Sequence, residues 1–272
     1  MKILIVGHGF VGKAVDYGFS HPDVQKTIVD PKYGSSVDSV NPRNFDCVFV
    51  CVPTPMGKGG RIDSSIINNV LSKLESAPLV IVKSTVTPDI VEQWSYDVVY
   101  NPEFLTEKSA NEQFIDPPFH ILGGRKYYVD LAEDVFKTYS LCNPCPVLKM
   151  SLVEASFVKY TINAFLATKV TFFNQLFDAV GDTDANFATI IKAVGMDRRI
   201  GSSHTRVPGF DGKQGYGGAC FPKDTSALTQ YSNKLTLLQE CVRINNEYRS
   251  HYELDKREIE QHVNYGKAKK EQ

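Results

Sequence analysis

The stretch from Gly215 to Asp224, GYGGACFPKD, places three glycines beside a single cysteine, Cys220. Glycine lets the backbone approach a ligand closely, and Lys223 and Asp224 supply a cation and a potential base near the thiol. This setting is typical of a nucleophilic cysteine. Taken alone, the stretch fits a glycine-rich surface loop with one buried, inert cysteine equally well.

A second glycine-rich stretch follows the first apolar run of the chain. Residues 2–6 form that run, the next six residues are GHGFVG, and residues 13–19 have helical spacing. Gly7 permits a tight turn, Gly9 lets the backbone approach a pyrophosphate, and Gly12 lets helix and strand pack closely. Strand, glycine turn and helix in this order predict a Rossmann unit, whose helix N-terminus favours the phosphate charge.

The cofactor follows from the end of the next predicted strand, residues 27–29. This strand ends at Asp30, about 20 residues beyond the glycines, where a carboxylate accepts hydrogen bonds from the adenosine ribose hydroxyls. A carboxylate there also repels a 2′-phosphate. We therefore predict NAD rather than NADP, with Lys32 as the nearby cation that tempers this preference.

Three further apolar runs end in polar segments. Residues 47–52 lead into Pro-Thr-Pro, residues 79–82 into KSTV, and residues 98–100 into NPEFLTE. Ligands of open α/β sheets bind beyond the carboxyl ends of the strands, so the repeated placement favours a site, although each segment alone fits a solvated loop as well. Glu103 and Glu107 are four residues apart and would share one face of a short helix.

The pattern changes after two closing strands predicted at residues 119–124 and 146–148. Ser151 and Glu154 form a capping box, and apolar spacing from there predicts a helix of about 30 residues. Such a length suits a spine or a dimer interface. Lys159 and Asn163 lie at positions i and i+4 of this helix, although such a pair alone is more often a solvated stripe.

The remaining chain is predicted to be helical. A second helix is expected near residues 185–194, followed by a long Gly- and Pro-bearing loop that delivers Cys220. Helix resumes near Asp224 and runs in broken form to His262, and the polar tail from Tyr265 is expected to fray. The fold class is therefore α/β, with a doubly wound parallel sheet in residues 1–150 and a helical central domain in residues 151–272.

Composition bounds the class of partner. The 272 residues carry 30 Lys and Arg against 31 Asp and Glu, a net charge of −1, so no basic field draws the chain to nucleic acid or to a membrane. No apolar run approaches the roughly 20 residues that span a bilayer. Six scattered cysteines suggest a reducing cytoplasm. Cys142 and Cys145 lack a second ligand pair, so we expect no metal.

Together the motifs resemble the nucleotide-sugar dehydrogenases, the UDP-glucose/GDP-mannose dehydrogenase family. The resemblance covers nearly the whole chain, in this order: GHGFVG at Gly7, VPTP at Val52, KSTV at Lys83, NPEFLTE at Asn101, KYTINAF at Lys159, RIG at Arg199 and GYGGACFPKD at Gly215. It implies a four-electron oxidation of UDP-glucose to UDP-glucuronate that consumes two NAD per sugar. The aldehyde would stay bound to Cys220 as a thiohemiacetal and then become a thioester that water hydrolyses.

The resemblance also implies residue roles. Cys220 would be the nucleophile, Lys159 and Asn163 would stabilise oxyanions, Asp224 would take a proton from the attacking water, and Thr85 and Glu103 would support the water network. Arg199 would reach a substrate on the other subunit of a dimer built on the helix from Ser151. The implied cofactor contacts are Gly7, Gly9, Phe10, Val11, Gly12, Asp30, Val52, Pro53, Thr54, Thr85, Glu107 and Lys223. The implied substrate contacts are Glu103, Phe104, Leu105, Lys159, Asn163, Arg199, Gly217 and Cys220.

Other functions stay open at this point. Relatives carry a further C-terminal domain that holds much of the nucleotide, and this sequence stops just after the helix that would lead into it, so we expect a short form with weak nucleotide binding. One alternative is a catalytically weak or silent NAD-binding subunit that needs a partner chain, and another is a GDP-mannose 6-dehydrogenase. A 6-phosphogluconate-type or 3-hydroxyacid dehydrogenase shares the predicted plan, but its reaction needs no cysteine.

Overall fold

The structure of the chain is a computed structural model that describes residues 1–94 and 97–266. It divides into two compact units. The sheet unit comprises Met1–Thr54 and Asp63–Lys159, and the helical unit comprises Pro55–Ile62 and the described residues from Tyr160 onward. The division thus falls after Lys159, inside a helix, and the predicted domain boundary at residue 150 falls just before that helix begins.

The sheet unit is built on one seven-stranded sheet with the order β2-β1-β3-β4-β5-β6-β7. Neighbouring strands are parallel from β2 through β5, β5 and β6 are antiparallel, and β6 and β7 are parallel to each other. The predicted doubly wound sheet is therefore confirmed, with its two closing strands reversed relative to the other five. The strands are β1 (Lys2–Val6), β2 (Gln25–Val29), β3 (Cys47–Val50), β4 (Val80–Val82), β5 (Val99–Tyr100), β6 (His120–Gly123) and β7 (Val147–Met150).

Both faces of this sheet are buried, which explains the nearly continuous apolar runs of its strands. Successive side chains of a strand point to opposite faces. Along β1, Ile3 and Ile5 therefore enter one hydrophobic core, while Leu4 and Val6 enter the other. These four side chains are at most 4% exposed, so the strand cannot shift by one residue without turning each of them to the wrong core.

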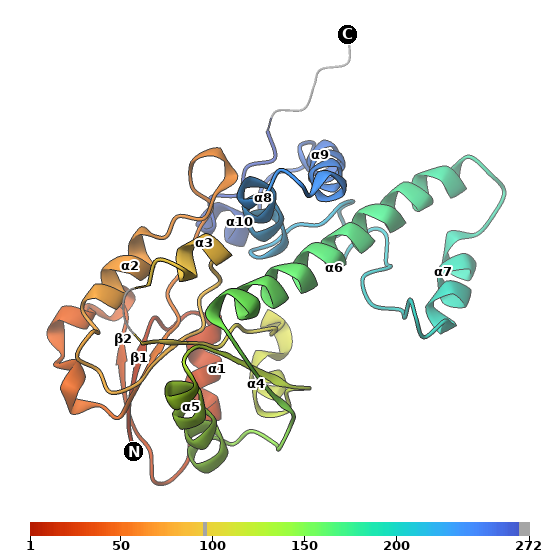
Figure 1. Ribbon diagram of the computed structural model, residues 1–272. Helices are drawn as coiled ribbons and strands as arrows, with labels where there is room; N and C mark the ends of the chain where they lie inside the picture. The colour runs from red at the N-terminus through yellow and green to blue at the C-terminus, as the bar shows by residue number, and fades with distance from the viewer. Residues whose placement is uncertain (95–96, 267–272) are drawn as a thin grey trace. The chain divides into compact units, whose positions relative to one another are not determined.

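Helices cover the two faces in separate groups (Figure 1). Phe114 and Phe136 pack with Phe19 and Phe49 in the core under α1, α4 and α5, and the core on the other face includes residues of α2 and α3. The helices of the sheet unit are α1 (Phe10–Gly18), α2 (Ser65–Ser72), α3 (Pro88–Val91), α4 (Ala110–Ile115) and α5 (Lys126–Tyr139). Short 3-10 turns are η1 (Pro31–Tyr33), η2 (Val37–Ser39), η3 (Pro42–Asn44), η4 (Lys58–Gly60, in the helical unit) and η5 (Glu107–Ser109).

The long predicted helix is present as α6, Leu152–Gly181, which is 30 residues long. The predicted capping box starts it: the Ser151 N–H donates to Glu154 Oε2 at 2.7 Å, and the Glu154 N–H donates to Ser151 Oγ at 3.2 Å. Ala155 and Ser156 of its first turns are fully buried, and the Ser156 hydroxyl donates to the Val86 carbonyl at 2.7 Å. The capping residues therefore fix where the helix leaves the sheet.

The helical unit continues with α7 (Phe187–Met196), α8 (Phe221–Tyr231), α9 (Thr236–Arg249) and α10 (Lys256–Glu260). The expected start of helix near Asp224 is wrong by three residues, because Pro222 fits the first turn of a helix and α8 already begins at Phe221. The expectation that the tail frays from Tyr265 is also wrong for that residue. Tyr265 is only 7% exposed, and its hydroxyl donates to Glu258 Oε1 at 2.7 Å.

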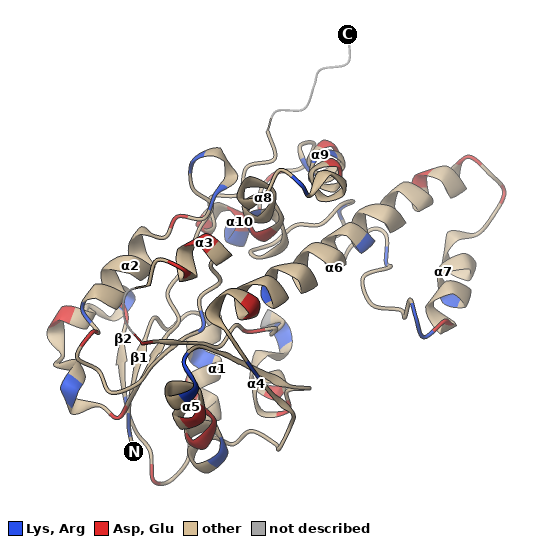
Figure 2. Ribbon diagram, in the orientation of Figure 1, with Lys and Arg blue, Asp and Glu red and all other residues tan. Residues whose placement is uncertain are grey.

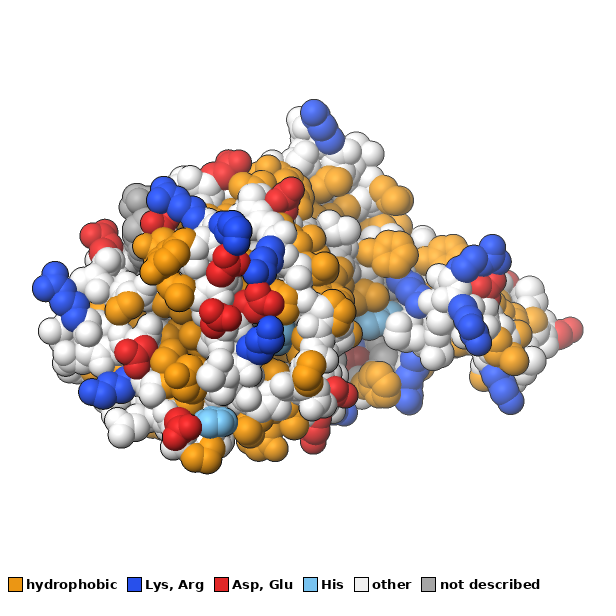
Figure 3. Space-filling model, turned by 60° about the horizontal axis from the view of Figure 1, so that its bottom comes forward, with side chains coloured by type: hydrophobic (Ala, Val, Ile, Leu, Met, Phe, Trp, Pro, Cys, Tyr) orange, Lys and Arg blue, Asp and Glu red, His pale blue; other side chains and the backbone are white. Residues whose placement is uncertain are grey.

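Charged residues of both signs occur in both units among the residues that the structure describes. Lys and Arg lie among Asp and Glu along the ribbon (Figure 2), and the face drawn in Figure 3 mixes both signs with scattered apolar side chains. Within the described ranges, no helix combines the length and the apolar character that a membrane crossing requires.

Candidate active site

The glycine turn after β1 has two glycines that the fold requires and one that it does not. Gly7 has φ +87°, and a Cβ there would lie 2.7 Å from the Cys51 carbonyl oxygen. A Cβ on Gly12 would overlap the Gly7 carbonyl oxygen. At Gly9, by contrast, no atom of the described residues other than its immediate chain neighbours lies within 4 Å of the Cβ position. The open space is therefore at the glycine that the dinucleotide fingerprint reserves for the pyrophosphate.

The end of β2 leads directly into Asp30, the carboxylate expected to bind the ribose. Asp30 accepts hydrogen bonds from the His8 N–H at 2.6 Å and the Lys32 N–H at 2.9 Å. Burial raises the pKa of Asp30, but these backbone hydrogen bonds, with the charge of Lys32, outweigh burial and hold its pKa below the ordinary value. The carboxylate is therefore ionised and oriented at the end of the strand.

His8 and Tyr33 lie beside Asp30 and Lys32, and neither was singled out from the sequence. The His8 ring lies 2.9 Å from the Tyr33 hydroxyl and 3.3 Å from Asp16 Oδ2, and the Lys32 ammonium donates to the His8 carbonyl. Lys32 Nζ is 3.8 Å from Asp30 Oδ2. The predicted tempering cation thus lies within ion-pair distance of the Asp30 carboxylate.

Replacing Asp30 with alanine is expected to raise the Kd for NAD by about tenfold and to narrow the preference for NAD over NADP, because charged hydrogen bonds to the ribose are lost. Fluorescence titration with both cofactors measures this. Asp38→Ala is the matched control, since Asp38 is an exposed carboxylate of the same unit that pairs with Lys73. An unchanged ratio of the two Kd values in Asp30→Ala would show that Asp30 does not read the ribose.

The loops after β3 and β4 are tied together at the carboxyl edge of the sheet. The Thr54 hydroxyl donates to the Thr85 carbonyl at 2.7 Å, and the Ser84 hydroxyl donates to the Val52 carbonyl at 2.7 Å. Thr85 itself is partly exposed, and Pro53 is exposed. Phe10 and Val11 are partly buried in the first turn of α1. The predicted cofactor residues of these segments therefore all follow strands of the parallel part of the sheet.

The segment after β5 differs from what its spacing suggested. Glu103 does not share a helix with Glu107, because residues 101–106 are irregular and η5 begins only at Glu107. A local hydrogen bond accounts for this: Glu103 Oε2 accepts from the Leu105 N–H at 2.6 Å, which competes with helical pairing. The side chain of Glu107, predicted to line the nicotinamide site, lies outside the described part of the structure.

Lys159 is joined to this segment. Its ammonium donates to the Glu103 carbonyl at 2.6 Å and lies 5.2 Å from the centre of the Phe104 ring. Lys159 is 3% exposed and Glu103 is 7% exposed. The structure therefore brings together the predicted residues Lys159, Glu103 and Phe104 within the sheet unit, and buries the cation where a hydrogen-bond partner holds it in one position.

A second buried lysine lies next to this cluster. Lys83 Nζ donates to Asn101 Oδ1 at 2.8 Å, and Asn101 Nδ2 donates to the Ile121 carbonyl at 2.8 Å. Burial lowers the pKa of Lys83, a trend that the nearby Cys51 and Glu103 oppose. No role was predicted for Lys83 or Asn101, although both stand directly after strands. These hydrogen bonds link the residues that follow β4 and β5 to each other and to β6. They therefore fix the start of the segment that carries Glu103.

In the helical unit, Cys220 is the N-cap residue of α8. Its carbonyl accepts the Asp224 N–H at 2.9 Å, so the first turn of the helix starts on the cysteine. The end of a helix that carries the positive partial charge favours a thiolate over a thiol. Gly215 and Gly218 have φ +74° and +80°, a left-handed conformation that glycine adopts without strain. The glycines therefore allow the loop to turn so that the cysteine can enter the helix.

Three predicted residues meet one turn into α8. Asp224 is 1% exposed, and its carboxylate accepts Asn163 Nδ2 at 2.7 Å and Lys223 Nζ at 2.5 Å. The expected i, i+4 arrangement on α6 places Asn163 one turn after Lys159. Lys223, predicted to contact the cofactor, is buried beside Asp224 in this structure. Each oxygen of the Asp224 carboxylate is thus held by a donor, which fixes its orientation.

The contacts of Arg199 involve none of the residues around Asp224 described above. It follows α7 and forms an ion pair with Asp197, with Nη2 2.6 Å from Asp197 Oδ2, and its side chain is 88% exposed. Gly217 belongs to the loop that leads to Cys220 and packs closely on Glu258, because a Cβ there would lie 2.5 Å from Glu258 Oε1.

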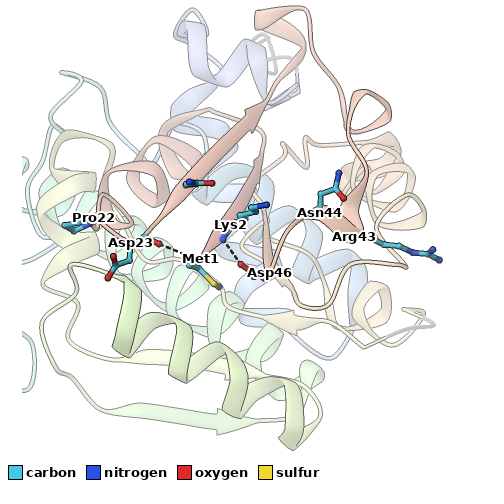
Figure 4. Close-up of a pocket in the computed structure, with 8 residues that line it drawn as sticks. Met1, Lys2, Pro22, Asp23, Arg43, Asn44 and Asp46 are labelled. Atoms are coloured by element: carbon cyan, nitrogen blue, oxygen red, sulfur yellow. Dashed lines mark hydrogen bonds between the residues drawn. The ribbon is translucent and has the colours of Figure 1, made fainter.

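One hollow of the sheet unit is at the opposite edge of the sheet (Figure 4). It has a volume of about 690 Å³, and none of its lining residues was predicted to be functional. The Lys2 N–H donates to Asp46 Oδ2 at 2.7 Å on its wall. Because it opens at the amino ends of β1 and β2, it is at the edge where ligands of such sheets do not bind. Its lining residues are Met1, Lys2, Pro22, Asp23, Gln25, Arg43, Asn44 and Asp46.

Metal ligands are not gathered anywhere in the described ranges, where no group of three or more His, Cys, Asp or Glu side chains could hold an ion. Cys142 instead donates its thiol hydrogen to the Phe114 carbonyl at 3.1 Å, and burial raises the pKa of both Cys142 and Cys145. Burial therefore favours the protonated form of both thiols.

Comparison with known proteins agrees with this architecture. Residues 32–140 match the UDP-glucose/GDP-mannose dehydrogenase family, NAD binding domain, and residues 153–247 match the central domain of the same family. The UDP-glucose 6-dehydrogenase of Rickettsia prowazekii is 34% identical over 209 residues, which make up 68% of this chain and 45% of that protein. The UDP-glucose 6-dehydrogenase TuaD of Bacillus subtilis is 30% identical over 250 residues, 84% of this chain and 52% of that protein.

A solved structure extends the likeness over nearly the whole chain. The UDP-glucose dehydrogenase from Pyrobaculum islandicum superposes with a TM-score of 0.76 at 27% identity, covering 92% of this chain and 69% of that one. The chain belongs to the UDP-glucose/GDP-mannose dehydrogenase family, and its sheet unit carries the family's NAD-binding domain. It spans about half the length of the curated relatives it matches.

Proposed function

We propose that this chain carries out the NAD-dependent oxidation of a nucleotide sugar, taking the primary alcohol of UDP-glucose to the carboxylate of UDP-glucuronate. The observation that carries the proposal is the position of Cys220 at the N-terminus of α8, one turn before the buried Asp224 with its partners Asn163 and Lys223. A nucleophilic thiol and a fixed carboxylate are what a two-step oxidation to an acid requires.

Cys220 acts on the aldehyde that the first oxidation produces. Its thiolate adds to the aldehyde carbon to form a thiohemiacetal, which keeps the intermediate on the protein. NAD, when bound, accepts a hydride in each of the two oxidations. The second oxidation converts the thiohemiacetal to a thioester, and water then breaks the C–S bond to release the acid and restore the thiol.

Asp224 and Asn163 act on the proton and the oxyanion of these steps. Asp224 takes the proton of the attacking water, and the Asn163 and Lys223 hydrogen bonds support this role by holding the carboxylate in one orientation. Lys159 and Asn163 stabilise the alkoxide and tetrahedral oxyanions as hydrogen-bond donors. Lys159 is suited to this because burial and the Glu103 carbonyl restrict its ammonium to one position.

The remaining proposed roles concern binding. Gly7, Gly9 and Gly12 with Asp30 bind NAD, and open space at Gly9 supports this assignment. Thr85 and Glu103 support the water network, while Phe104, Leu105 and Gly217 contact the substrate. Further proposed cofactor contacts are Phe10, Val11, Val52, Pro53, Thr54, Glu107 and Lys223. A reactive thiol requires a reducing compartment, so we place the protein in the cytoplasm.

We also expect a homodimer that forms through α6, in which Arg199 reaches the substrate of the partner subunit. The side chains of Phe165 and Phe172 on this helix are 68% and 58% exposed, and a large aromatic surface of this kind favours association. Sedimentation velocity at micromolar concentration is expected to show a dimer, and Phe165→Glu with Phe172→Glu a monomer. Tyr127→Glu, on the exposed face of α5, is the control. A monomeric wild-type protein would contradict the expectation.

A panel of nucleotide sugars, read by NADH absorbance at saturating NAD, tests the proposed activity. UDP-glucose is expected to give the highest kcat/KM. If GDP-mannose gives the highest kcat/KM, the protein is the alternative GDP-mannose 6-dehydrogenase, which uses the same chemistry. No NADH with any sugar, from a protein that binds NAD, would instead establish the silent NAD-binding subunit and overturn the proposed function.

A further inference from the structure

The loop that carries Cys220 rests on a buried ion pair in the helical unit. Arg249, the last residue of α9, is 1% exposed, and Glu258 of α10 is fully buried. Arg249 Nη2 donates to Glu258 Oε1 at 2.8 Å. The loop packs directly on this pair, because a Cβ on Gly217 would overlap the Arg249 guanidinium and lie 2.5 Å from Glu258 Oε1.

Glu258 also binds the loop backbone. Its Oε1 accepts the Gly218 N–H at 3.1 Å, the Arg249 guanidinium, and the Tyr265 hydroxyl at 2.7 Å. Its Oε2 accepts the Asp255 N–H at 2.8 Å in a capping box that starts α10. Burial raises the pKa of Glu258, but the hydrogen bonds from Asp255, Tyr265 and Gly218 outweigh burial and hold its pKa below the ordinary value. The Glu258 carboxylate is therefore an acceptor for the N–H of Gly218, which stands two residues before Cys220.

Arg249 also holds the loop at a second point. Its Nη1 donates to Asp211 Oδ2 at 2.7 Å, and Asp211 lies in the long segment that leads to Cys220. Between the two points, the amide of Asn245 on α9 clamps Tyr216: its Oδ1 accepts the Tyr216 N–H at 2.6 Å and its Nδ2 donates to the Tyr216 carbonyl at 3.1 Å. Asp211, Tyr216 and Gly218 are thus each held by a side chain of α9 or α10.

The free energy needed to bury the Arg249–Glu258 ion pair indicates that the pair positions the loop more than it stabilises the fold. Taking two charges out of water costs free energy that their attraction offsets only in part, and an apolar pair of similar volume is often as stabilising or more so. What an ion pair adds is direction, because its donors and acceptors fit one backbone position. Arg249, Glu258 and Tyr265 all lie after residue 247, beyond the residues that match the family's central domain.

We propose that Arg249, Glu258 and Tyr265 are positioning residues for Cys220, which hold its loop so that the thiol starts α8. The proposal rests on the proposed function of Cys220 as the nucleophile. None of the three side chains is assigned a contact with substrate or cofactor, so their effect is expected on kcat and on the thiol, and not on NAD binding.

Glu258→Gln tests the carboxylate at nearly constant volume. Whichever way the amide turns, its NH₂ group faces a donor: either the Gly218, Arg249 and Tyr265 donors or the Asp255 N–H. Tyr265→Phe is milder, because it removes one hydroxyl and leaves the ion pair in place. Glu260→Gln is the matched control, since Glu260 lies on the same helix and its side chain is 58% exposed.

The expected result is a graded loss. Glu258→Gln is expected to lower kcat with UDP-glucose by about tenfold or more, because small displacements of a reacting group are costly. Tyr265→Phe is expected to lower it by less, and Glu260→Gln is expected to leave it unchanged. The Kd for NAD stays at the wild-type value in all three. The rate at which iodoacetamide alkylates Cys220 in the absence of substrate, followed by mass spectrometry of its peptide, falls in the same order because the released thiol loses the favourable end of α8.

Wild-type kcat and wild-type Cys220 alkylation in Glu258→Gln would overturn the proposal. If Glu258→Gln does not fold, Tyr265→Phe decides by the same two readouts, and wild-type values there would overturn it. Failure of the proposed function gives a different result: Cys220→Ala would then keep full activity, whatever the Glu258 variant does.

Discussion

Replacing Cys220 with alanine is expected to abolish acid formation while NAD binding stays near the wild-type value. The thiol acts on the sugar carbon and not on the dinucleotide, and its loss leaves nothing to hold the aldehyde for the second oxidation. Loss of an enzymatic nucleophile lowers kcat by about 10³-fold or more. The measurement is the rate of NADH formation with UDP-glucose, together with the Kd for NAD from fluorescence titration.

Cys241→Ala is the matched control for this substitution. Cys241 is a buried cysteine of α9 in the same unit and has no proposed role in the reaction. It is expected to keep the wild-type rate. Full turnover to the acid by Cys220→Ala would refute the thiohemiacetal mechanism, whatever the family resemblance implies.

The glycine turn gives the second large effect, in which two similar substitutions should behave differently. Gly12→Ala places a methyl group where the Gly7 carbonyl oxygen lies, and overpacking against backbone costs about 1–3 kcal/mol. We expect it to lower the free energy of unfolding and to abolish NAD binding together, because the turn itself must move. Chemical denaturation and NAD titration measure the two effects.

Gly9→Ala is expected to weaken NAD binding with little change in the free energy of unfolding. Its φ of −70° suits alanine, and no described atom beyond the immediate chain neighbours lies within 4 Å of the new Cβ, so the free energy of unfolding should fall by less than about 1 kcal/mol. The Kd for NAD should nevertheless rise by about tenfold or more, since the methyl group occupies the approach of the pyrophosphate. Unchanged NAD affinity in Gly9→Ala would show that the dinucleotide does not pass over this glycine.

The features that followed from the sequence are those set by local rules. Continuous apolar runs predicted the strands of the sheet. The fixed offsets of Gly7, Gly9 and Gly12 predicted the glycine turn, and Ser151 with Glu154 predicted the start of α6. Each of these depends on residues within a few positions of one another, so each is visible without the fold.

The features that did not follow depend on partners far apart in the chain or on competing local bonds. Glu103 bonds the Leu105 N–H and so prevents the short helix expected with Glu107. Lys83 forms a hydrogen bond with Asn101, which follows the neighbouring strand. Arg249 forms one with Asp211, which is 38 residues away in the sequence. Spacing carries no signal for such pairs. A lysine or asparagine directly after a buried strand is the one cue that would have identified Lys83 and Asn101.

The most direct test of the account counts the NADH formed for each nucleotide sugar consumed by the purified protein. With UDP-glucose in limiting amount and NAD in excess, absorbance gives the NADH and mass spectrometry identifies the product. The account predicts two NADH per sugar, a product carboxylate and no free aldehyde, because Cys220 retains the intermediate between the oxidations. One NADH per sugar, with an aldehyde or ketone released into solution, would contradict it.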